Sequence, residues 1–384
     1  MEVASTRTTA SGVPSQDDSA PRLPTEICGR IIDHLAAGLV LYYRDLAGDP
    51  NLLALRSCAL VCRDWYFHTW YHLRRRVHLR DRNDVLSLSR TLRERPRLRG
   101  VVRQVVISGH TSGQRSVIQH LGTFTAMLAG KLPELWRITI EDAELTIGSM
   151  RMEDFGYLAA FHLIHTLNIV NVNVPSIARL AGLISALPGL TNLWCINVDC
   201  LQKLSVSPVS LPLNSASLEL LDVIWVAPAI QDLLGRISQA SRLRILRLGV
   251  DEDLTLSSAG SRSQTLLNAS AASVEVLILE FDPDSFVDRG SDSLGSAVER
   301  HLNLSRHESL WRLRIVLYHP FVAWSWIPHI ISRIPSKHLM AISVLFFIGT
   351  DHAADDLDGA VTMMVEDGIL ASATLATTGP RLKN

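Results

Sequence analysis

Two cysteines and two histidines are the side chains whose spacing first suggests chemistry. Cys58 and Cys62 stand four residues apart, one helical turn, so both thiolates could bind one metal ion. His162 and His165 are also close in the sequence, and imidazoles serve as ligands and as general bases. Neither pair has further ligands, an acid or a nucleophile at a spacing that completes a site. We therefore expect no metal and no other cofactor.

The short motifs of common catalytic sites are missing from the chain. It has no Gly-x-Gly-x-x-Gly loop, no Gly-Lys-Ser/Thr phosphate loop, no His-Glu-x-x-His pair and no Gly-x-Ser-x-Gly elbow. We expect a protein that is not an enzyme and that acts by binding.

A basic segment runs from Arg74 to Arg103. It holds eleven arginines against three carboxylates, so it could attract nucleic acid or an acidic protein. The whole chain nevertheless has a net charge of −1, and the segment lacks the interleaved aromatic residues of a base-stacking surface. We expect a solvated helix that links two parts of the chain.

Helices are predicted on the N-terminal side of this segment. Pro24 and Glu26 suit the first turn of a helix, and the residues that follow repeat an aliphatic stripe through Ile27, Ile31 and Leu35. A second start signal is Asp49-Pro50, a capping carboxylate followed by proline. Two or three short helices should pack together here. Their apolar side chains outnumber what so small a unit can bury, so some should face another protein.

Residues 21–80 resemble the F-box family. The pair Leu23-Pro24 with the acidic and aliphatic residues after it is similar to the opening of that family, and Leu55 to Cys62 is similar to its central segment. The run Val61-Cys62-Arg63-Asp64-Trp65 is similar to the family's signature of a hydrophobic residue, Cys-Arg, any residue and Trp. The connection from Ala36 to Asp49 is longer than the family's usual link.

The resemblance implies that this module binds a Skp-type adaptor and, through it, a cullin-RING ubiquitin ligase. The adaptor-binding positions that it implies are all apolar: Leu23, Pro24, Ile27, Ile31, Leu52, Leu55, Cys58, Val61 and Trp65. The alternative is that these side chains fill the core of a helical hairpin, and for Trp65 the two readings are balanced.

Beyond the module, the pattern apolar-x-x-apolar-x-apolar recurs along the chain. Its first positions are 25 to 36 residues apart, and that near-regular recurrence indicates a repeat. Between the repeats lie helical stripes, such as Ile177 to Leu187, so strands and helices should alternate. The nine triplets are Val102/Val105/Ile107, Leu135/Ile138/Ile140, Ile164/Leu167/Ile169, Leu190/Leu193/Cys195, Leu218/Leu221/Val223, Leu243/Leu246/Leu248, Val274/Leu277/Leu279, Leu310/Leu313/Ile315 and Leu339/Ile342/Val344.

This body resembles an irregular leucine-rich repeat. The resemblance implies a curved solenoid with parallel strands, in which stacked neighbours share one core. The asparagine or cysteine expected three places after each triplet is absent, so we expect no ladder of side-chain amides along the turns. The fold class is therefore α/β: a small all-α F-box-like module followed by a leucine-rich-repeat-like solenoid. An ordinary mixed α/β domain is the alternative.

A solenoid would bind its target on the exposed face of the strands. Residues between the triplet positions point away from the core because side chains alternate along a strand. The candidate substrate-binding residues are Arg137, Asn168, Asn192, Asp222, Arg247 and Arg314. For any single one of them, ordinary solvated surface is the favoured interpretation.

Composition places the chain among globular proteins. It has 384 residues, of which 47% are hydrophobic and 20% charged. We expect a disordered leader at 1–20, the F-box-like module at 21–80, the solenoid at 81–350 and an acidic, partly mobile tail at 351–384. Five scattered cysteines, no secretory signal and no apolar run of membrane-spanning length predict an intracellular protein, cytoplasmic or nuclear.

The sequence therefore favours a substrate-recognition subunit of a Skp-cullin-F-box type ubiquitin ligase. Its partners would be the adaptor and an unknown protein target, with no membrane. One alternative is a repeat-built interaction scaffold outside ubiquitination. The other is a nucleic-acid binder that uses residues 74–103, which predicts salt-sensitive binding weakened by replacing Arg74, Arg75 and Arg76.

Overall fold

The computed structural model divides the chain into two compact units. The described residues are 24–41, 50–109, 113–202, 211–250, 261–281, 298, 302–317 and 326–346. One unit ends at Arg74 and the other begins at Arg75. The leader expected at 1–20 and the tail expected at 351–384 lie outside the described residues.

The first unit contains three helices, α1 (Thr25–Leu41), α2 (Pro50–Cys58) and α3 (Arg63–Arg75). Both predicted starts are confirmed. The carbonyl of Pro24 accepts hydrogen bonds from the backbone N–H of Ile27 and Cys28, which begins α1, and Pro50 is the first residue of α2. None of the described helices is long and apolar enough to cross a membrane.

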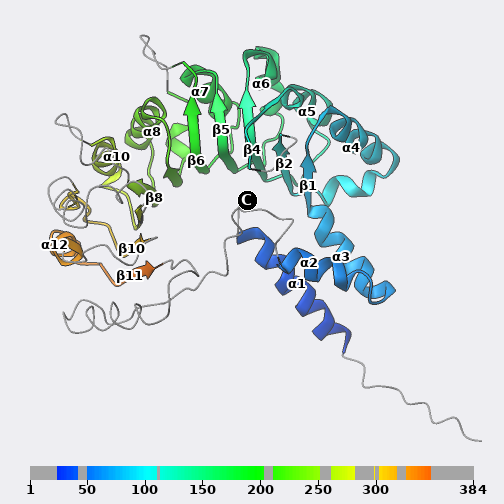
Figure 1. Ribbon diagram of the computed structural model, residues 1–384, viewed down its shortest axis with the longest axis horizontal. Helices are drawn as coiled ribbons and strands as arrows, with labels where there is room; N and C mark the ends of the chain where they lie inside the picture. The colour runs from blue at the N-terminus through cyan, green and yellow to red at the C-terminus, as the bar shows by residue number, and fades with distance from the viewer. Residues whose placement is uncertain are drawn as a thin grey trace, which may run out of the picture. The chain divides into compact units, whose positions relative to one another are not determined.

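The second unit is built on one large parallel sheet with helices on one of its faces (Figure 1). Ten of its eleven strands follow one another in chain order, and β3 pairs with β4 outside that order. The strands are β1 (Arg76–Leu79), β2 (Gln104–Ser108), β3 (Ser116–Ile118), β4 (Arg137–Leu145), β5 (Thr166–Val174), β6 (Asn192–Cys200), β7 (Leu220–Ile224), β8 (Ile245–Val250), β9 (Val276–Phe281), β10 (Arg312–Leu317) and β11 (Ala341–Phe346).

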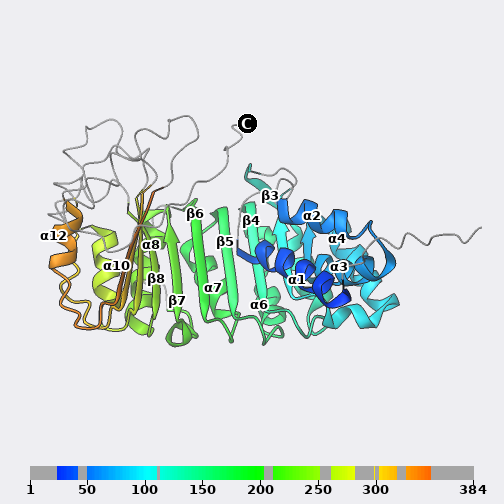
Figure 2. The ribbon, with the colours of Figure 1, turned by 90° about the horizontal axis from the view of Figure 1, so that it is seen from below.

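Helices connect successive strands on the outer face, while the strands lie side by side in Figure 2. The α-helices described are α4 (Arg82–Glu94), α5 (His120–Leu128), α6 (Met152–Leu158), α7 (Ile177–Ser185), α8 (Pro228–Ala240), α10 (Arg262–Ser270) and α12 (Trp326–Ser332). Three 3-10 turns are η1 (Pro96–Gly100), η2 (Ile147–Ser149) and η3 (Ser215–Ser217). The predicted helical stripes form α7 and α8, and Ser176 caps α7 by accepting a hydrogen bond from the backbone N–H of Arg179.

The core is made by the triplets predicted from the sequence. The second triplet residues stand opposite one another in register from Val105 on β2 to Ile342 on β11, and the third ones form a parallel row from Ile107 to Val344. From β2 to β10 every member of both rows is at most 2% exposed. Parallel strands with alternating apolar residues are therefore confirmed, and the core lies between the sheet and the helices.

The expectation for residues 74–103 was wrong. They do not form a single linking helix but contain the end of α3, strand β1, helix α4 and η1. Val77 and Leu79 of β1 stand in register with Val105 and Ile107, so the sheet begins one strand earlier than the first triplet. The pattern missed this strand because β1 lacks the apolar residue that opens each triplet.

We predict that Leu193→Ala lowers the free energy of unfolding by about 2–5 kcal/mol. Leu193 is fully buried in the middle of the sheet, and the truncation leaves a cavity between close-packed neighbours. The measurement is urea unfolding of the full chain. Leu213→Ala, at a leucine that is 93% exposed, is the matched control and should stay within about 0.5 kcal/mol of the wild type. Equal effects of the two substitutions would contradict the core described above.

Candidate functional site

The helical unit has a small interior. Ile32, Leu55 and Cys58 form its buried cluster, and Leu35, Ala36, Trp65 and Leu73 pack against that cluster while remaining partly exposed. So few buried side chains stabilise three helices weakly on their own. Cys28 of α1 is also buried, and several other apolar residues among those described in this unit are exposed.

Seven large apolar side chains of this unit are exposed by at least 40%. They come from all three helices and from the turn between α2 and α3: Ile27, Ile31, Leu53, Leu60, Val61, Tyr66 and Phe67. Single exposed apolar residues are normal on a protein surface, but seven in a unit of this size are many. We refer to these seven residues together as the apolar surface, and they are candidate docking residues for another protein.

The structure separates the predicted adaptor-binding residues into three groups. Pro24, Ile27, Ile31 and Val61 are exposed and belong to, or lie next to, the apolar surface. Leu52 and Trp65 are half-buried. Leu55 and Cys58 lie inside the unit, where they hold the helices together. Leu23 lies outside the described residues.

The predicted substrate-binding residues share one face of the sheet. Asn168, Asp222, Arg247 and Arg314 lie in a single row across β5 to β10, and Trp194 and Ile278 occupy the same row. Arg137 and Asn192 lie in the adjacent row, with Thr166 between them. Both rows alternate with the buried aliphatic rows, so these side chains lie on the face opposite the core, hereafter the polar face.

Burial differs along the polar face. Asn168 and Asp222 are at most 1% exposed, whereas Arg137, Asn192, Arg247 and Arg314 are half-buried. Asn168 Nδ2 donates a hydrogen bond to Thr139 Oγ1 at 3.1 Å, and Asn192 Nδ2 donates to Thr166 Oγ1 at 3.2 Å. The guanidinium of Arg137 stacks over Trp136, whose ring stacks in turn on His165. Burial and the charge of Arg137 lower the pKa of His165.

An ion-pair cluster occupies the polar face between β7 and β9. Arg247 Nε donates to Glu280 Oε2 at 2.7 Å, and its Nη1 lies 3.3 Å from Asp222 Oδ2. Burial raises the pKa of Asp222 to about 7, with the nearby charge of Glu280 adding to the effect and Arg247 opposing it. Within the described part of the chain, Asp222 Oδ1 has no hydrogen-bond partner. Sequence reasoning found Asp222 and Arg247 but missed Glu280.

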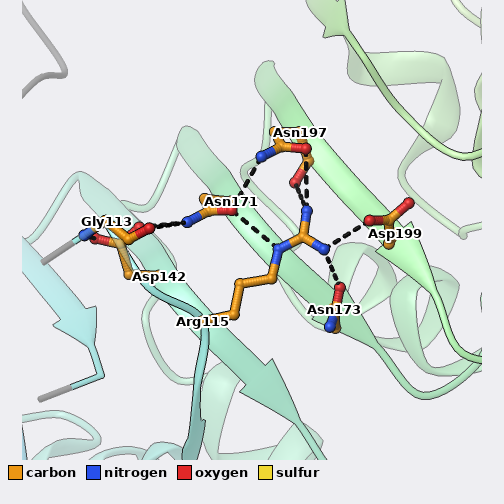
Figure 3. A network of polar contacts seen from close by, with 7 residues as sticks. All are labelled: Gly113, Arg115, Asp142, Asn171, Asn173, Asn197 and Asp199. Atoms are coloured by element: carbon orange, nitrogen blue, oxygen red, sulfur yellow. Dashed lines mark hydrogen bonds and ion pairs between the residues drawn. The ribbon is translucent and has the colours of Figure 1, made fainter. Parts of the chain in front are cut away.

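A second polar network joins the carboxyl ends of β4, β5 and β6 (Figure 3). Arg115 is at its centre: Nε donates to Asn171 Oδ1 at 2.9 Å, and Nη2 donates to both Asn197 oxygens at 3.0 Å. Its Nη1 reaches Asn173 Oδ1 at 2.5 Å and Asp199 Oδ2 at 2.6 Å. The guanidinium is thus held by several acceptors and has little capacity left for a ligand.

The same network contains a ladder of left-handed residues. Asp142, Asn171 and Asn197 have φ values of 50°, 54° and 52°, and Trp225 beyond β7 has 51°. Asn171 Nδ2 donates to Asp142 Oδ1 at 2.7 Å, and Asn197 Nδ2 donates to Asn171 Oδ1 at 2.9 Å. Asn and Asp tolerate this backbone conformation better than other residues with a Cβ.

The expectation of no amide ladder was therefore wrong. The ladder residues stand two places after the last triplet residue, not three. The third place holds Ala143, Val172 and Val198, which are fully buried, because the left-handed residue shifts the alternation by one position. Asp142, Asn171 and Asn197 recur 29 and 26 residues apart, and that spacing was the available signal.

The cysteines and His162 lie in different environments. Cys58 is buried and Cys62 exposed, and all five cysteines are free thiols. Burial raises the pKa of Cys58 and Cys195, which disfavours their thiolates. His162 is exposed on the turn before β5.

Comparison with known proteins finds no family whose model matches this chain and no match among curated proteins. The proposals below therefore depend on the residues and geometry described above.

We predict that Asp222→Asn flattens the pH dependence of stability between about pH 4 and 7. The folded pKa of Asp222 is about 7 and the ordinary value is 3.8, so its stabilising contribution is complete below about pH 4 and is lost as the pH rises through 7. The difference amounts to about 4 kcal/mol at most. Urea unfolding at several pH values measures it.

Asp232→Asn is the control for this experiment, because Asp232 is 65% exposed. It should leave the pH profile of the wild type unchanged. A profile for Asp222→Asn that runs parallel to the wild type would contradict the raised pKa.

We also predict that Asn171→Ala lowers the free energy of unfolding by about 1–3 kcal/mol, because it removes ladder hydrogen bonds and keeps a Cβ at positive φ. Asn171→Gly loses the same hydrogen bonds but accepts the backbone conformation, so it should be about 1 kcal/mol more stable than Asn171→Ala. Urea unfolding compares the two. A glycine variant no more stable than the alanine variant would contradict the left-handed conformation.

Proposed function

We propose that this chain is the substrate-recognition subunit of a Skp-cullin-F-box type ubiquitin ligase. The helices of residues 21–80 bind a Skp-type adaptor, and the repeated sheet binds a protein target. The observation that carries the proposal is the apolar surface of the helical unit, where Ile27, Ile31 and Val61 are exposed although the unit has only a small described core. A unit with this composition gains stability when a partner covers it.

The sequence resemblance and the exposed side chains support the same assignment. The signature residues Val61 and Cys62 stand at the exposed turn between α2 and α3, and the leucine-proline opening stands at the start of α1. Leu55 and Cys58 support the helices from inside, so the adaptor contact is assigned to Pro24, Ile27, Ile31, Val61 and the partly exposed Leu52 and Trp65.

The second unit supports the target-binding half of the proposal. Consecutive parallel strands that share two in-register rows of buried side chains, with helices on one face, support the proposal of a leucine-rich-repeat-like solenoid. Its polar face presents the half-buried cations Arg137, Arg247 and Arg314 beside buried carboxylates. Such a face suits a protein target with acidic groups at matching positions.

The receptor needs no reactive residue of its own. By holding a target beside a separate catalytic complex, it raises the effective concentration of the target there.

We predict that Ile31→Asp and Val61→Asp each weaken co-purification with a Skp-type adaptor at least tenfold, because a buried carboxylate in an apolar interface costs more than about 1.4 kcal/mol. Both side chains are exposed, so the variants should fold, and circular dichroism checks that. The measurement is pull-down of the full chain with purified adaptor, followed by a binding titration.

Leu213→Asp is the matched control, since Leu213 is an exposed leucine of the other unit. It should bind the adaptor as the wild type does. A wild-type chain that retains no adaptor would overturn the proposal in favour of a scaffold outside ubiquitination. Retention that survives both aspartate variants would assign the contact to another surface.

A further inference from the structure

Three side chains of the helical unit bring metal-binding atoms together outside the apolar residues of the proposed function. Asp33 comes from α1, and His68 and His72 come from α3. Asp33 Oδ1 lies 3.2 Å from His68 Nε2 and 2.7 Å from His72 Nε2. One ligand atom from each of the three residues lies within 4.8 Å of the others.

The local sequence explains why the two imidazoles converge. His68 and His72 are four residues apart on one helix, so their side chains lie on the same face, one turn apart. Their rings are 5.3 Å apart in an edge-to-face arrangement. Asp33 is 35 residues before His68, so it reaches them only because α1 packs in the same unit. The group is thus a product of the tertiary fold.

The spacing of the three donors is close to that of a metal site. Zinc binds imidazole nitrogen and carboxylate oxygen at about 2.0–2.2 Å, which puts neighbouring ligands of a tetrahedral ion about 3.3 Å apart. The separation between Asp33 and His68 already has this value, and that between Asp33 and His72 needs to widen by about half an ångström. The donor atoms of His68 and His72 lie within 4.8 Å of each other, so this pair needs to approach by at most about 1.5 Å. Asp33 and His68 are exposed, so their side chains have room for these rotations.

The donor set and its surroundings select the kind of metal. Two imidazoles and one carboxylate suit zinc and its neighbours in the first transition row, whereas magnesium and calcium prefer sets of oxygen ligands. His72 is buried, with 7% of its side chain exposed, while His68 and Asp33 are open to solvent at 43% and 58%. The site is therefore anchored on one side and leaves room for water as a further ligand on the other.

We propose that Asp33, His68 and His72 bind one divalent transition-metal ion, with zinc as the best-fitting ion. The ion links α1 to α3 in a unit whose described residues include few buried apolar ones: Cys28, Ile32, Leu55 and Cys58. Metal binding to the folded arrangement stabilises that arrangement, so the ion adds to the stability that the small apolar core provides. The inference is independent of the proposed ligase function, because no adaptor-binding residue is a ligand.

The first test is a calorimetric titration of the full chain with zinc chloride after removal of bound metal. We expect one zinc ion per chain, and at least tenfold weaker binding by His68→Ala and by His72→Ala. His34→Ala is the matched control: His34 is an exposed histidine of α1, next to Asp33 but outside the group, and this variant should bind as the wild type does. Cys62→Ser excludes a contribution from the exposed thiol.

Asp33→Asn separates a metal site from a simple hydrogen-bonded contact. The amide oxygen still accepts a hydrogen bond from an imidazole, but it is a much weaker metal ligand than a carboxylate. We expect this variant to keep its helical content by circular dichroism and to lose at least tenfold in zinc affinity.

A second measurement needs no variant. Carbethoxylation of histidines in the wild-type chain, read by mass spectrometry, should be suppressed by zinc at His68 and His72 and remain unchanged at His34. Stoichiometric binding that survives all three ligand substitutions, or no zinc binding by the wild type at micromolar concentration, would overturn the proposal. Adaptor binding that fails while zinc binding persists would affect only the ligase assignment.

Discussion

The sheet depends on two rows of apolar side chains that run across its strands in chain order from β1 to β11, with β3 outside them. A single strand and its covering helix cannot by themselves exclude water from their apolar faces. Each strand with its helix is therefore stable only between neighbouring strands in the same register. Leu193, for example, packs in a row between Leu167 and Leu221, and Cys195 between Ile169 and Val223. The register is fixed because a slip by one residue would turn these side chains to the polar face and bring Asn168 or Asp222 into the core.

The left-handed ladder adds a local feature to this repeated plan. Strands β4, β5 and β6 have nine residues each, while β7 to β11 have five or six. After the left-handed residue, the alternation resumes with Ala143, Val172 and Val198 inside, so the longer strands bury a further apolar row. The amide ladder and Arg115 supply hydrogen-bond partners to the side chains of the left-handed residues, where the alternation of inward and outward side chains shifts by one residue.

The sequence predicted the fold well where one residue type repeats for one physical reason. The triplets, the parallel strands, and the helices starting near Pro24, Pro50 and Ile177 all follow from apolar periodicity and capping. The periodicity did not reveal β1, because Val77 and Leu79 supply the second and third triplet positions but Arg74 stands where the first apolar residue would be. The ladder was missed because the left-handed residue shifts the repeat by one place, a change of backbone conformation that composition does not encode.

The candidate sites were less predictable. The polar-face residues were found because alternation along a strand is local, but the burial of Asp222 and its contact with Arg247 depend on three strands together. The group of Asp33, His68 and His72 was not found at all, since its members are 35 and 39 residues apart and only helix packing joins them. By contrast, the exposure of Ile27, Ile31 and Val61 agrees with the excess of apolar residues that the sequence displays.

The long strands and the short strands of the sheet are linked to their neighbours by different kinds of side chain. In the segment from β4 to β6, Arg115 and the amide ladder add side-chain hydrogen bonds to the backbone pairing of the strands. The segment from β8 to β11 has shorter strands and holds the charged row around Arg247 and Arg314. That row is itself tied between β7 and β9 by the contacts of Arg247 with Asp222 and Glu280, so charged side chains link the short strands where amides and Arg115 link the long ones.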